Sequence, residues 1–288
     1  EAVASLQLEA ELRRALADHQ IHAVYQPIVA LGTGTVVGFE ALARWIHPER
    51  GTIYPDRFIK VAEETGLISA LGKQILVAAC TQIQTWNREG RPRFHVAVNL
   101  SARQLTRTFA TEVRAILANF GVDPTMLTFE ITESALMDPD GPEVARLAEL
   151  RKAGIRLAID DFGTGYSSLG RLQAFPVDAL KIDRSFVSGT NAPEGDWEIV
   201  KAVLALASNL GLVAIAEGIE TQQQLDKLRE LGCPYGQGYF FSKPITVDQV
   251  GELLASGPPN LPQEITMAVP CPTSSTAPMP ASKMGLDR

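Results

Sequence analysis

Polar side chains able to bind a metal ion or to activate water follow short apolar runs along this 288-residue chain. If those runs are parallel strands of a barrel, their carboxyl ends meet at one rim and bring the polar groups together. Carboxylates crowded at one rim need a cation or a proton between them, and oxygen ligands favour hard ions such as Mg²⁺ or Mn²⁺. The residues concerned are Glu40, Asn99, Glu130, Asp160, Asp161, Lys181, Asp183, Glu217 and Gln237.

The adjacent pair Asp160 and Asp161 predicts two ions in this site. One carboxylate can bridge two cations while its neighbour, turned by the following Gly163, reaches only the second. Two cations about 4 Å apart suit in-line attack on a phosphodiester. Arg44 follows Glu40 by four residues, so in an extended strand both side chains lie on the same side. The Arg44 guanidinium is then within reach of a phosphate that the metal holds.

Each of these residues also has an ordinary structural interpretation. A single acid at a strand end is often a helix cap or a surface ion pair, and the two aspartates could form an Asx turn. Lys181 could neutralise one neighbour, and Arg44 could lie on the surface beside Trp45. Glu63 and Glu64, near Lys60, indicate a solvated helix face. The structural interpretation needs a separate coincidence at the end of nearly every strand, and this favours a shared metal site.

Eight strand-like runs rich in Val, Ile and Phe alternate with helical stretches. They span 21–30, 35–44, 94–100, 126–132, 155–160, 178–182, 212–217 and 235–240, the last weakened by two glycines. The first two runs are joined by too few residues for a crossover, which predicts an antiparallel hairpin. Strands alternating with helices indicate βα units. We therefore expect an α/β protein, a modified TIM barrel with one antiparallel strand, with an open doubly wound sheet as the alternative.

Helix boundaries can be assigned at three places between these runs. Pro142 suits the first turn of a helix that Gly154 ends. Thr221 and Gln224 form a capping box before a helix that ends at Gly232. A further apolar helical run ends at Gly211.

The two ends of the chain differ from the region between them. Leu8, Leu12 and Leu16 recur at helical spacing, which predicts a connector helix within residues 1–18. Residues 257–288 contain seven prolines among Ser, Thr and Ala and are expected to form a disordered tail. Residues 19–256 then form the barrel domain. Because the chain begins without Met, we expect it to be part of a longer protein.

Composition excludes several classes of protein and site. The chain has 33 acidic and 26 basic side chains and a net charge of −7, which disfavours DNA as a partner. No apolar run reaches the roughly 18 residues needed to cross a bilayer. Three cysteines and four histidines are dispersed, so we expect neither a disulfide framework nor a zinc site. A reducing, cytoplasmic location is expected for this region, and the parent protein could be anchored to the inner membrane.

The motifs that carry these residues resemble those of the EAL domain family. Glu40-Ala41-Leu42-x-Arg44 is the signature from which that family takes its name. The resemblance covers about Leu12 to Leu254. It continues through Tyr25-Gln26-Pro27, Asn99-Leu100-Ser101, Glu130-x-Thr132-Glu133, Asp160-Asp161-Phe162-Gly163-Thr164-Gly165, Leu180-Lys181-Ile182-Asp183, Ala216-Glu217-Gly218-Ile219-Glu220 and Gln237-Gly238-Tyr239.

The resemblance implies a bacterial phosphodiesterase that opens cyclic di-GMP to linear pGpG with Mg²⁺ or Mn²⁺, two ions in each active site. In that family Lys181 would orient or activate the attacking water, and Glu217 would be the general base. The implied ligands of the first ion are Glu40, Asn99, Glu130 and Asp160. The implied ligands of the second are Asp160, Asp161 and Glu217. The implied substrate contacts are Gln26, Leu42, Arg44, Asp183 and Gln237.

The resemblance also implies a regulatory loop and several partners. Glu133 would anchor the loop D-D-F-G-T-G-Y-S-S-L, which in this family links dimerisation to activity, and Glu220 would support the same rim. The implied partners are cyclic di-GMP, a second copy in a homodimer formed through the barrel, and an upstream sensory or diguanylate-cyclase-like domain.

The sequence departs from the family pattern at two positions, and two other functions are alternatives to hydrolysis. Lys60 stands where many relatives have Pro, and Ile219 where Val is commoner, but no proposed ligand is substituted. A receptor that binds cyclic di-GMP without cleaving it usually lacks one or more ligands, whereas this chain retains them all. An enolase-like lyase would also set acids and a Lys at strand ends, but it has no need of Arg44 or Gln26. Hydrolysis is therefore the leading prediction.

Overall fold

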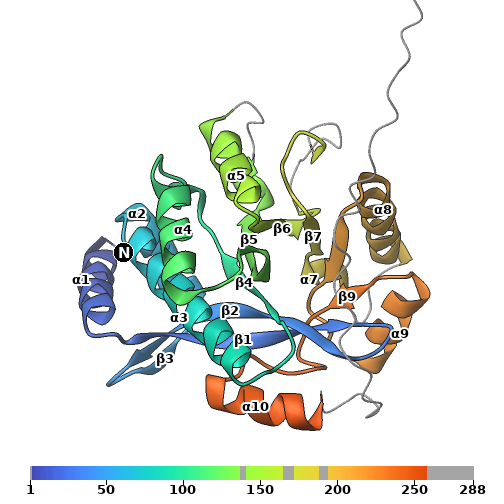
Figure 1. Cartoon of the computed structure of the whole chain (residues 1–288), viewed down its shortest axis with the longest axis horizontal. Coiled ribbons are helices and arrows are strands. Elements are labelled where there is room, and N and C mark those ends of the chain that lie inside the picture. Colours follow the sequence, from blue (N-terminus) through green and yellow to red (C-terminus); the bar gives the residue numbers. More distant parts are fainter. Residues whose placement is uncertain (1, 137–140, 165–171, 188–193, 258–288) are drawn as a thin grey trace, which may run out of the picture.

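The computed structural model describes residues 2–136, 141–164, 172–187 and 194–257, and their strands close into a barrel (Figure 1). Pairing runs from β1 through β2 and on around to β9, which pairs again with β1. The short strand β3 (Gly51–Ile53) lies outside the closed sheet and pairs only with the end of β2. The barrel strands are β1 (Ile21–Ala30), β2 (Val36–His47), β4 (His95–Asn99), β5 (Leu127–Thr132), β6 (Arg156–Phe162), β7 (Ala179–Ile182), β8 (Val213–Ala216) and β9 (Tyr235–Gly236).

Strand β1 runs opposite to the other barrel strands. It pairs antiparallel with both β2 and β9, whereas the remaining neighbours pair in parallel. The link to β2 is a tight turn in which Gly34, at φ 75°, adopts the left-handed conformation that glycine tolerates best. This confirms the modified TIM barrel with one antiparallel strand and excludes the open sheet.

Two strands differ from the predicted runs. β3 was not predicted, because three residues carry no period-2 pattern of their own. β9 pairs over only two residues, whereas the run at 235–240 predicted six. Gly236 and Gly238 explain the short ladder: a Cβ at Gly238 would lie 2.1 Å from the backbone oxygen of Ile219, so the chain turns away at a close backbone approach.

Helices surround the barrel, and Figure 1 shows α1 beside α2 and α10 next to β1. Three 3₁₀ turns, η1 (Ala102–Gln104), η2 (Pro124–Met126) and η3 (Glu133–Leu136), lie in the loops. Within the described ranges, no helix combines the length and the hydropathy that crossing a bilayer requires. The helices are α1 (Ala2–Ala17), α2 (Pro55–Glu64), α3 (Ile68–Arg88), α4 (Phe109–Phe120), α5 (Pro142–Lys152), α7 (Arg184–Val187), α8 (Glu194–Leu210), α9 (Gln222–Glu230) and α10 (Val247–Ser256).

The predicted helix boundaries are confirmed. Pro142 is the first residue of α5, and Gly154 follows its end at φ 90°. Thr221 accepts a hydrogen bond from the Gln224 backbone while the Gln224 side chain returns one, which is the predicted capping box of α9. Gly232 follows the end of that helix, as predicted.

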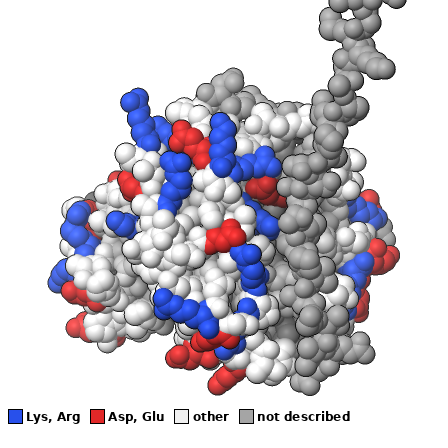
Figure 2. Space-filling view, viewed as in Figure 1, with Lys and Arg blue, Asp and Glu red and all other residues white. Residues whose placement is uncertain are grey.

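The ends of the chain are placed as follows. Leu12 on α1 is fully buried, and Arg50 Nη2 lies 2.8 Å from Glu11 Oε1, so α1 packs on the domain. Its role as a connector, and the domain boundaries at 18 and 256, remain predictions. The proline-rich tail lies outside the described residues from position 258 onward. In Figure 2, basic and acidic side chains are interspersed over the visible face.

Candidate functional site

The predicted polar residues come together at the carboxyl ends of the parallel strands. Alternate residues of a strand face the same side of a sheet, and neighbouring strands are in register so that Glu40 pairs with Ala97 and Asn99 with Glu130. Side chains from β2, β4, β5, β6, β7 and the segments after β8 and β9 therefore reach one rim. We call the carboxylates of Glu40, Glu130, Asp160, Asp161 and Glu217 the acidic cluster.

Lys181, on β7, lies at the centre of the acidic cluster. Its Nζ atom lies 2.7 Å from Glu130 Oε2 and 2.7 Å from Glu217 Oε1. The same atom lies 3.1 Å from Asp160 Oδ1 and 3.4 Å from Glu40 Oε2. The Lys181 side chain is only 1% exposed. One buried ammonium thus offsets the repulsion of four carboxylates, three of them on β2, β5 and β6 and the fourth, Glu217, directly after β8.

Two amide side chains complete the hydrogen bonds of this cluster. Asn99 Nδ2 donates to Glu40 Oε1 at 2.7 Å. Gln237 Nε2 donates to Glu40 Oε2 at 2.7 Å and to Glu217 Oε1 at 2.9 Å. Gln237 therefore ties the segment after β9 to β2 and to the segment after β8, although its strand contributes only two residues to the ladder.

Burial and mutual charge shift the pKa values of these groups in different directions. Burial opposes ionisation of Glu40, but Lys181, Gln237 and Asn99 outweigh it and hold the pKa of Glu40 below its usual value. Burial and the charge of Glu40 raise the pKa of Glu130 well above the ordinary range. Burial raises the pKa of Glu217 to about 7. Burial alone would lower the pKa of Lys181, but the surrounding carboxylates raise it well above its usual value.

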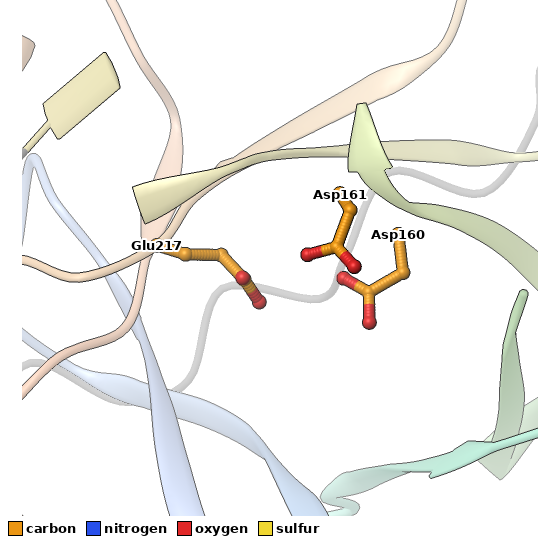
Figure 3. A group of neighbouring side chains, drawn as sticks. All are labelled: Asp160, Asp161 and Glu217. Atoms are coloured by element: carbon orange, nitrogen blue, oxygen red, sulfur yellow. The ribbon is translucent and has the colours of Figure 1, made fainter. Parts of the chain in front are cut away.

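The adjacent acids of β6 are held side by side by an unusual backbone. The β6–β7 pairing shifts register between Ile159 and Phe162, and Asp161 has φ 54°, a left-handed value that costs a non-glycine residue free energy. The irregularity turns two consecutive carboxylates toward Glu217 (Figure 3). Burial and the charge of Asp160 raise the pKa of Asp161 to about 6.

The donor set fits a hard divalent cation. Asp160, Asp161 and Glu217 each offer an oxygen, and these oxygens lie within 4.8 Å of one another. Asp160 Oδ1 is buried and makes no hydrogen bond among the described residues, although it lies close to Lys181. A buried carboxylate oxygen without a hydrogen bond is costly, and coordination to a cation would satisfy it.

Glu133 and Glu220, which the sequence associates with a supporting loop, occupy different positions. Glu133 is buried at the end of β5, and its Oε2 atom accepts a hydrogen bond of 3.0 Å from the backbone of Gly163. It therefore braces the turn that follows Asp161. The Glu220 side chain is exposed, and its backbone N–H donates to Gln224 Oε1 at 2.7 Å at the start of α9. Residues 165–169 of the predicted loop lie outside the described residues.

The predicted substrate contacts border the acidic cluster. Gln26 is buried and donates to the Ser242 carbonyl at 3.3 Å, and Leu42 is half-buried on β2. The guanidinium of Arg44 lies 5.3 Å from the ring centre of Tyr54, a cation–π distance. Asp183 accepts a 2.9 Å bond from the Ser185 backbone at the start of α7. Burial opposes ionisation of Asp183, but its hydrogen bonds outweigh this and hold its pKa below the usual value.

Two exposed tyrosines and one glutamate were not predicted as part of this region. Tyr54 and Tyr239 are 57% and 56% exposed and both lie near Arg44. Exposed aromatic rings beside a cation suit a planar ligand, but a lone Tyr in a loop carries no such signal in a sequence. Glu63 was predicted as part of a solvated face. Glu64 is exposed as predicted, but Glu63 is half-buried and its Oε1 atom accepts a 2.7 Å bond from Ser101 Oγ, two residues after Asn99.

Comparison with known proteins agrees with this arrangement. The EAL domain family model matches residues 9–244. The cyclic di-GMP phosphodiesterase NbdA of Pseudomonas aeruginosa is 46% identical over 254 residues, which are 88% of this chain and 32% of NbdA. The bifunctional diguanylate cyclase/cyclic di-GMP phosphodiesterase MucR of the same organism is 41% identical over 252 residues, 87% of this chain and 36% of MucR. This chain thus spans about a third of the length of these curated relatives.

Solved structures give the same result. The structure described as the PaMucR phosphodiesterase in complex with c-di-GMP superposes with a TM-score of 0.81 at 40% identity. The match covers 85% of this chain and 99% of that one. The two chains therefore share the barrel, with 40% of the aligned residues identical.

Proposed function

This chain belongs to the EAL domain family, and from that premise we propose that it hydrolyses cyclic di-GMP to linear pGpG in a metal-dependent reaction. The observation that carries the proposal is the acidic cluster around Lys181 at one rim of the barrel, with Asn99 hydrogen-bonded to its member Glu40. The name of NbdA and the description of the PaMucR complex attach this activity and this ligand to similar chains.

The metal we propose is Mg²⁺ or Mn²⁺, with two ions in the site. Glu40, Asn99, Glu130 and Asp160 would hold one ion, and Asp160, Asp161 and Glu217 the other. Such ions, when bound, lower the pKa of water and offset the charge that develops on a phosphodiester. The all-oxygen donor set and the lack of a hydrogen bond on Asp160 Oδ1 support this assignment.

Lys181 and Glu217 are the residues we propose for handling the attacking water. Lys181 Nζ lies within hydrogen-bonding distance of both Glu130 and Glu217, so it can hold a water molecule against this group of acids and add positive charge. Glu217 sits at the edge of the cluster, where Gln237 fixes one of its oxygens. Its other oxygen makes no hydrogen bond with the described residues and can accept a proton from water.

The substrate would lie across the rim between Arg44 and Asp183. Arg44 supplies the cation that a phosphate needs, and Tyr54 and Tyr239 add exposed rings on which a guanine base can stack. We call the proposed substrate position along the rim between Arg44 and Asp183 the substrate groove. Gln26, Leu42 and Gln237 would line it. Asp183 is held ionised by Ser185 and would accept hydrogen bonds from the substrate.

We also propose the wider setting of this domain. MucR carries a diguanylate cyclase name in addition to the phosphodiesterase name, and this chain matches only 36% of it. We propose that an upstream sensory or diguanylate-cyclase-like domain precedes this one. We also propose that the domain forms a homodimer through the barrel and is located in the cytoplasm. Glu133 and Gly163 would connect the dimer contact to the site, since their bond braces the segment after Asp161.

The direct test is to incubate the chain with cyclic di-GMP and Mn²⁺ or Mg²⁺ and to separate the products by chromatography. We expect linear pGpG with either ion and none in excess chelator, with activity returning when the ion is restored. The matched control is Glu49→Ala, which removes an exposed acid at the turn between β2 and β3. Tight binding of cyclic di-GMP without product, in a folded sample, would instead identify a receptor and refute hydrolysis.

A further inference from the structure

A cavity of about 410 Å³ lies inside the barrel beneath the acidic cluster. Its lining includes the inward-facing residues Ile28, Gly38 and Thr128 and the inward-facing Ile215 and Tyr235. It extends to the opposite end of the barrel, where the loops before β6, β7 and β8 meet. We call it the floor cavity. Its volume lies within the range of small-molecule sites, about 300–1,000 Å³.

The floor cavity exists because small residues occupy the layer beneath the site. Bulky branched side chains usually fill the interior of such barrels. Here a small residue stands two positions before each of four rim residues on the same strand and faces the same way. The pairs are Gly38 with Glu40, Ala97 with Asn99, Thr128 with Glu130, and Ala179 with Lys181. Gly38 admits nothing larger without a shift, because a Cβ there would lie 2.6 Å from the His95 carbonyl. Protein interiors are normally close-packed, so an open volume of this size is unusual.

The walls of the floor cavity are apolar and its mouth is cationic. Leu157, Phe175, Val177 and Val213 line the walls. At the mouth, Arg151 is neutralised by Asp178, with Nη2 and Oδ1 2.9 Å apart.

Arg156 at the same mouth has no such partner. It is half-buried, lines the cavity, and makes no side-chain hydrogen bond or ion pair with any residue in the described ranges. His95 is nearby, with Nδ1 3.0 Å from the Thr125 carbonyl. Burial and the charge of Arg156 lower the pKa of His95 to about 4, so it is neutral at pH 7. The floor cavity therefore combines a mainly apolar interior, with Glu130 at the end nearest the acidic cluster, and the charge of Arg156, unpaired among the described residues, at its opening.

We propose that the floor cavity binds an elongated amphipathic anion, with its apolar chain inside the barrel and its carboxylate at Arg156. Each end of such a ligand finds a suitable environment. The cavity walls remove the apolar chain of the ligand from water, and the Arg156 guanidinium gains an anionic partner in the carboxylate. Glu130 is common to the floor cavity and the acidic cluster. An occupant thus lies directly beneath the catalytic residues without entering the substrate groove.

The test is a calorimetric titration of the whole chain with decanoate, kept below its micellar concentration, alongside decanol as the uncharged probe of the same length. We expect one decanoate per chain and binding at least about tenfold weaker for decanol. Arg156→Gln should weaken decanoate binding by about tenfold and leave decanol binding unchanged. Val213→Phe, which fills the cavity, should abolish binding of both probes.

Arg114→Gln is the matched control, since Arg114 is an exposed arginine on α4 away from the floor cavity, and it should bind decanoate as the parent does. Thermal unfolding of each variant checks that it is folded. No decanoate binding up to about 1 mM by the folded parent chain would overturn the proposal. Unchanged binding in both Arg156→Gln and Val213→Phe would also overturn it. Neither result depends on hydrolysis, so the proposed function is tested separately.

Discussion

The two halves of the barrel interior differ although the same strands build them. At the rim that carries the acidic cluster, polar side chains are densely hydrogen-bonded and paired, and Lys181 alone contacts four carboxylates. Two residues earlier on the same strands, the side chains are small and leave an open volume. The difference shows that one strand can serve a tightly bonded site at its carboxyl end and leave its amino-terminal half loosely filled. Substitutions at the rim should therefore have large effects on catalytic activity. Substitutions at the floor should have smaller effects, mainly on the free energy of unfolding.

The largest effect is expected from removing an acid of the rim. Glu40→Ala and Asp160→Ala should each abolish measurable turnover, because each deletes a proposed metal ligand and leaves Lys181 with one fewer partner. Steady-state hydrolysis of cyclic di-GMP measures this, with Glu49→Ala as the exposed control. Residual activity close to that of the parent in either variant would contradict the metal assignment.

Replacement of Lys181 separates chemistry from packing at the rim. Lys181→Met should lower kcat while leaving substrate affinity nearly intact, because the ammonium acts on water rather than on substrate. In metal-free protein the free energy of unfolding should fall by about 3–5 kcal/mol, since two buried and two partly buried carboxylates lose their cation. Added Mn²⁺ should then raise the unfolding midpoint more in this variant than in the parent. A large loss of substrate affinity would argue against a water-orienting role.

Arg44 tests the edge of the rim where the substrate is proposed to lie. Arg44→Gln should lower kcat/KM by about 10- to 100-fold, mainly through KM, because one charged hydrogen bond contributes about 1.5–3 kcal/mol. Kinetics at several cyclic di-GMP concentrations give the two constants. Arg57→Gln, at an exposed position on α2, is the control. Equal constants for Arg44→Gln and the parent would remove Arg44 from the substrate site.

The smallest effect is expected at the floor. The folded pKa of His95, about 4, lies below its unfolded value of about 6.5. Its contribution to stability is therefore complete above pH 6.5 and is lost as the pH falls toward 4, because protonation charges a largely buried imidazole that also lies near Arg156. The loss should amount to about 2 kcal/mol after allowance for partial solvation. As the pH falls across this range, the unfolding midpoint of the parent should drop more than that of His95→Gln, and parallel curves would contradict this origin.

The barrel and the rim were largely predictable from sequence, for a specific reason. Polar residues recur at the ends of apolar runs, and the closure of a parallel sheet turns that one-dimensional regularity into a three-dimensional cluster. The reversed β1 was also predictable, because too few residues separate it from β2 to form a crossover. The same argument predicts that Glu40, Glu130, Asp160 and Lys181 lie close together.

Other features depended on contacts that no local pattern records. β3 is too short to show a period, and β9 ends early because Gly238 lies against the backbone of Ile219. Glu63 joins the rim region only because α2 packs beside Ser101. The small residues beneath the site are visible in the sequence, but whether they leave a cavity depends on how neighbouring side chains fill the space. These features therefore depend on long-range packing, which residue spacing along the sequence does not reveal.

The most direct test of the rim is to count the Mn²⁺ ions that it binds. Metal-free chain would be titrated with Mn²⁺ alone, with bound ions measured by calorimetry and by electron paramagnetic resonance. We predict two ions per chain with a spin-coupled signal, and at most one uncoupled ion in Asp160→Ala. If the parent binds no more Mn²⁺ than Asp160→Ala does, the acidic cluster is not the metal site and the proposed mechanism is wrong.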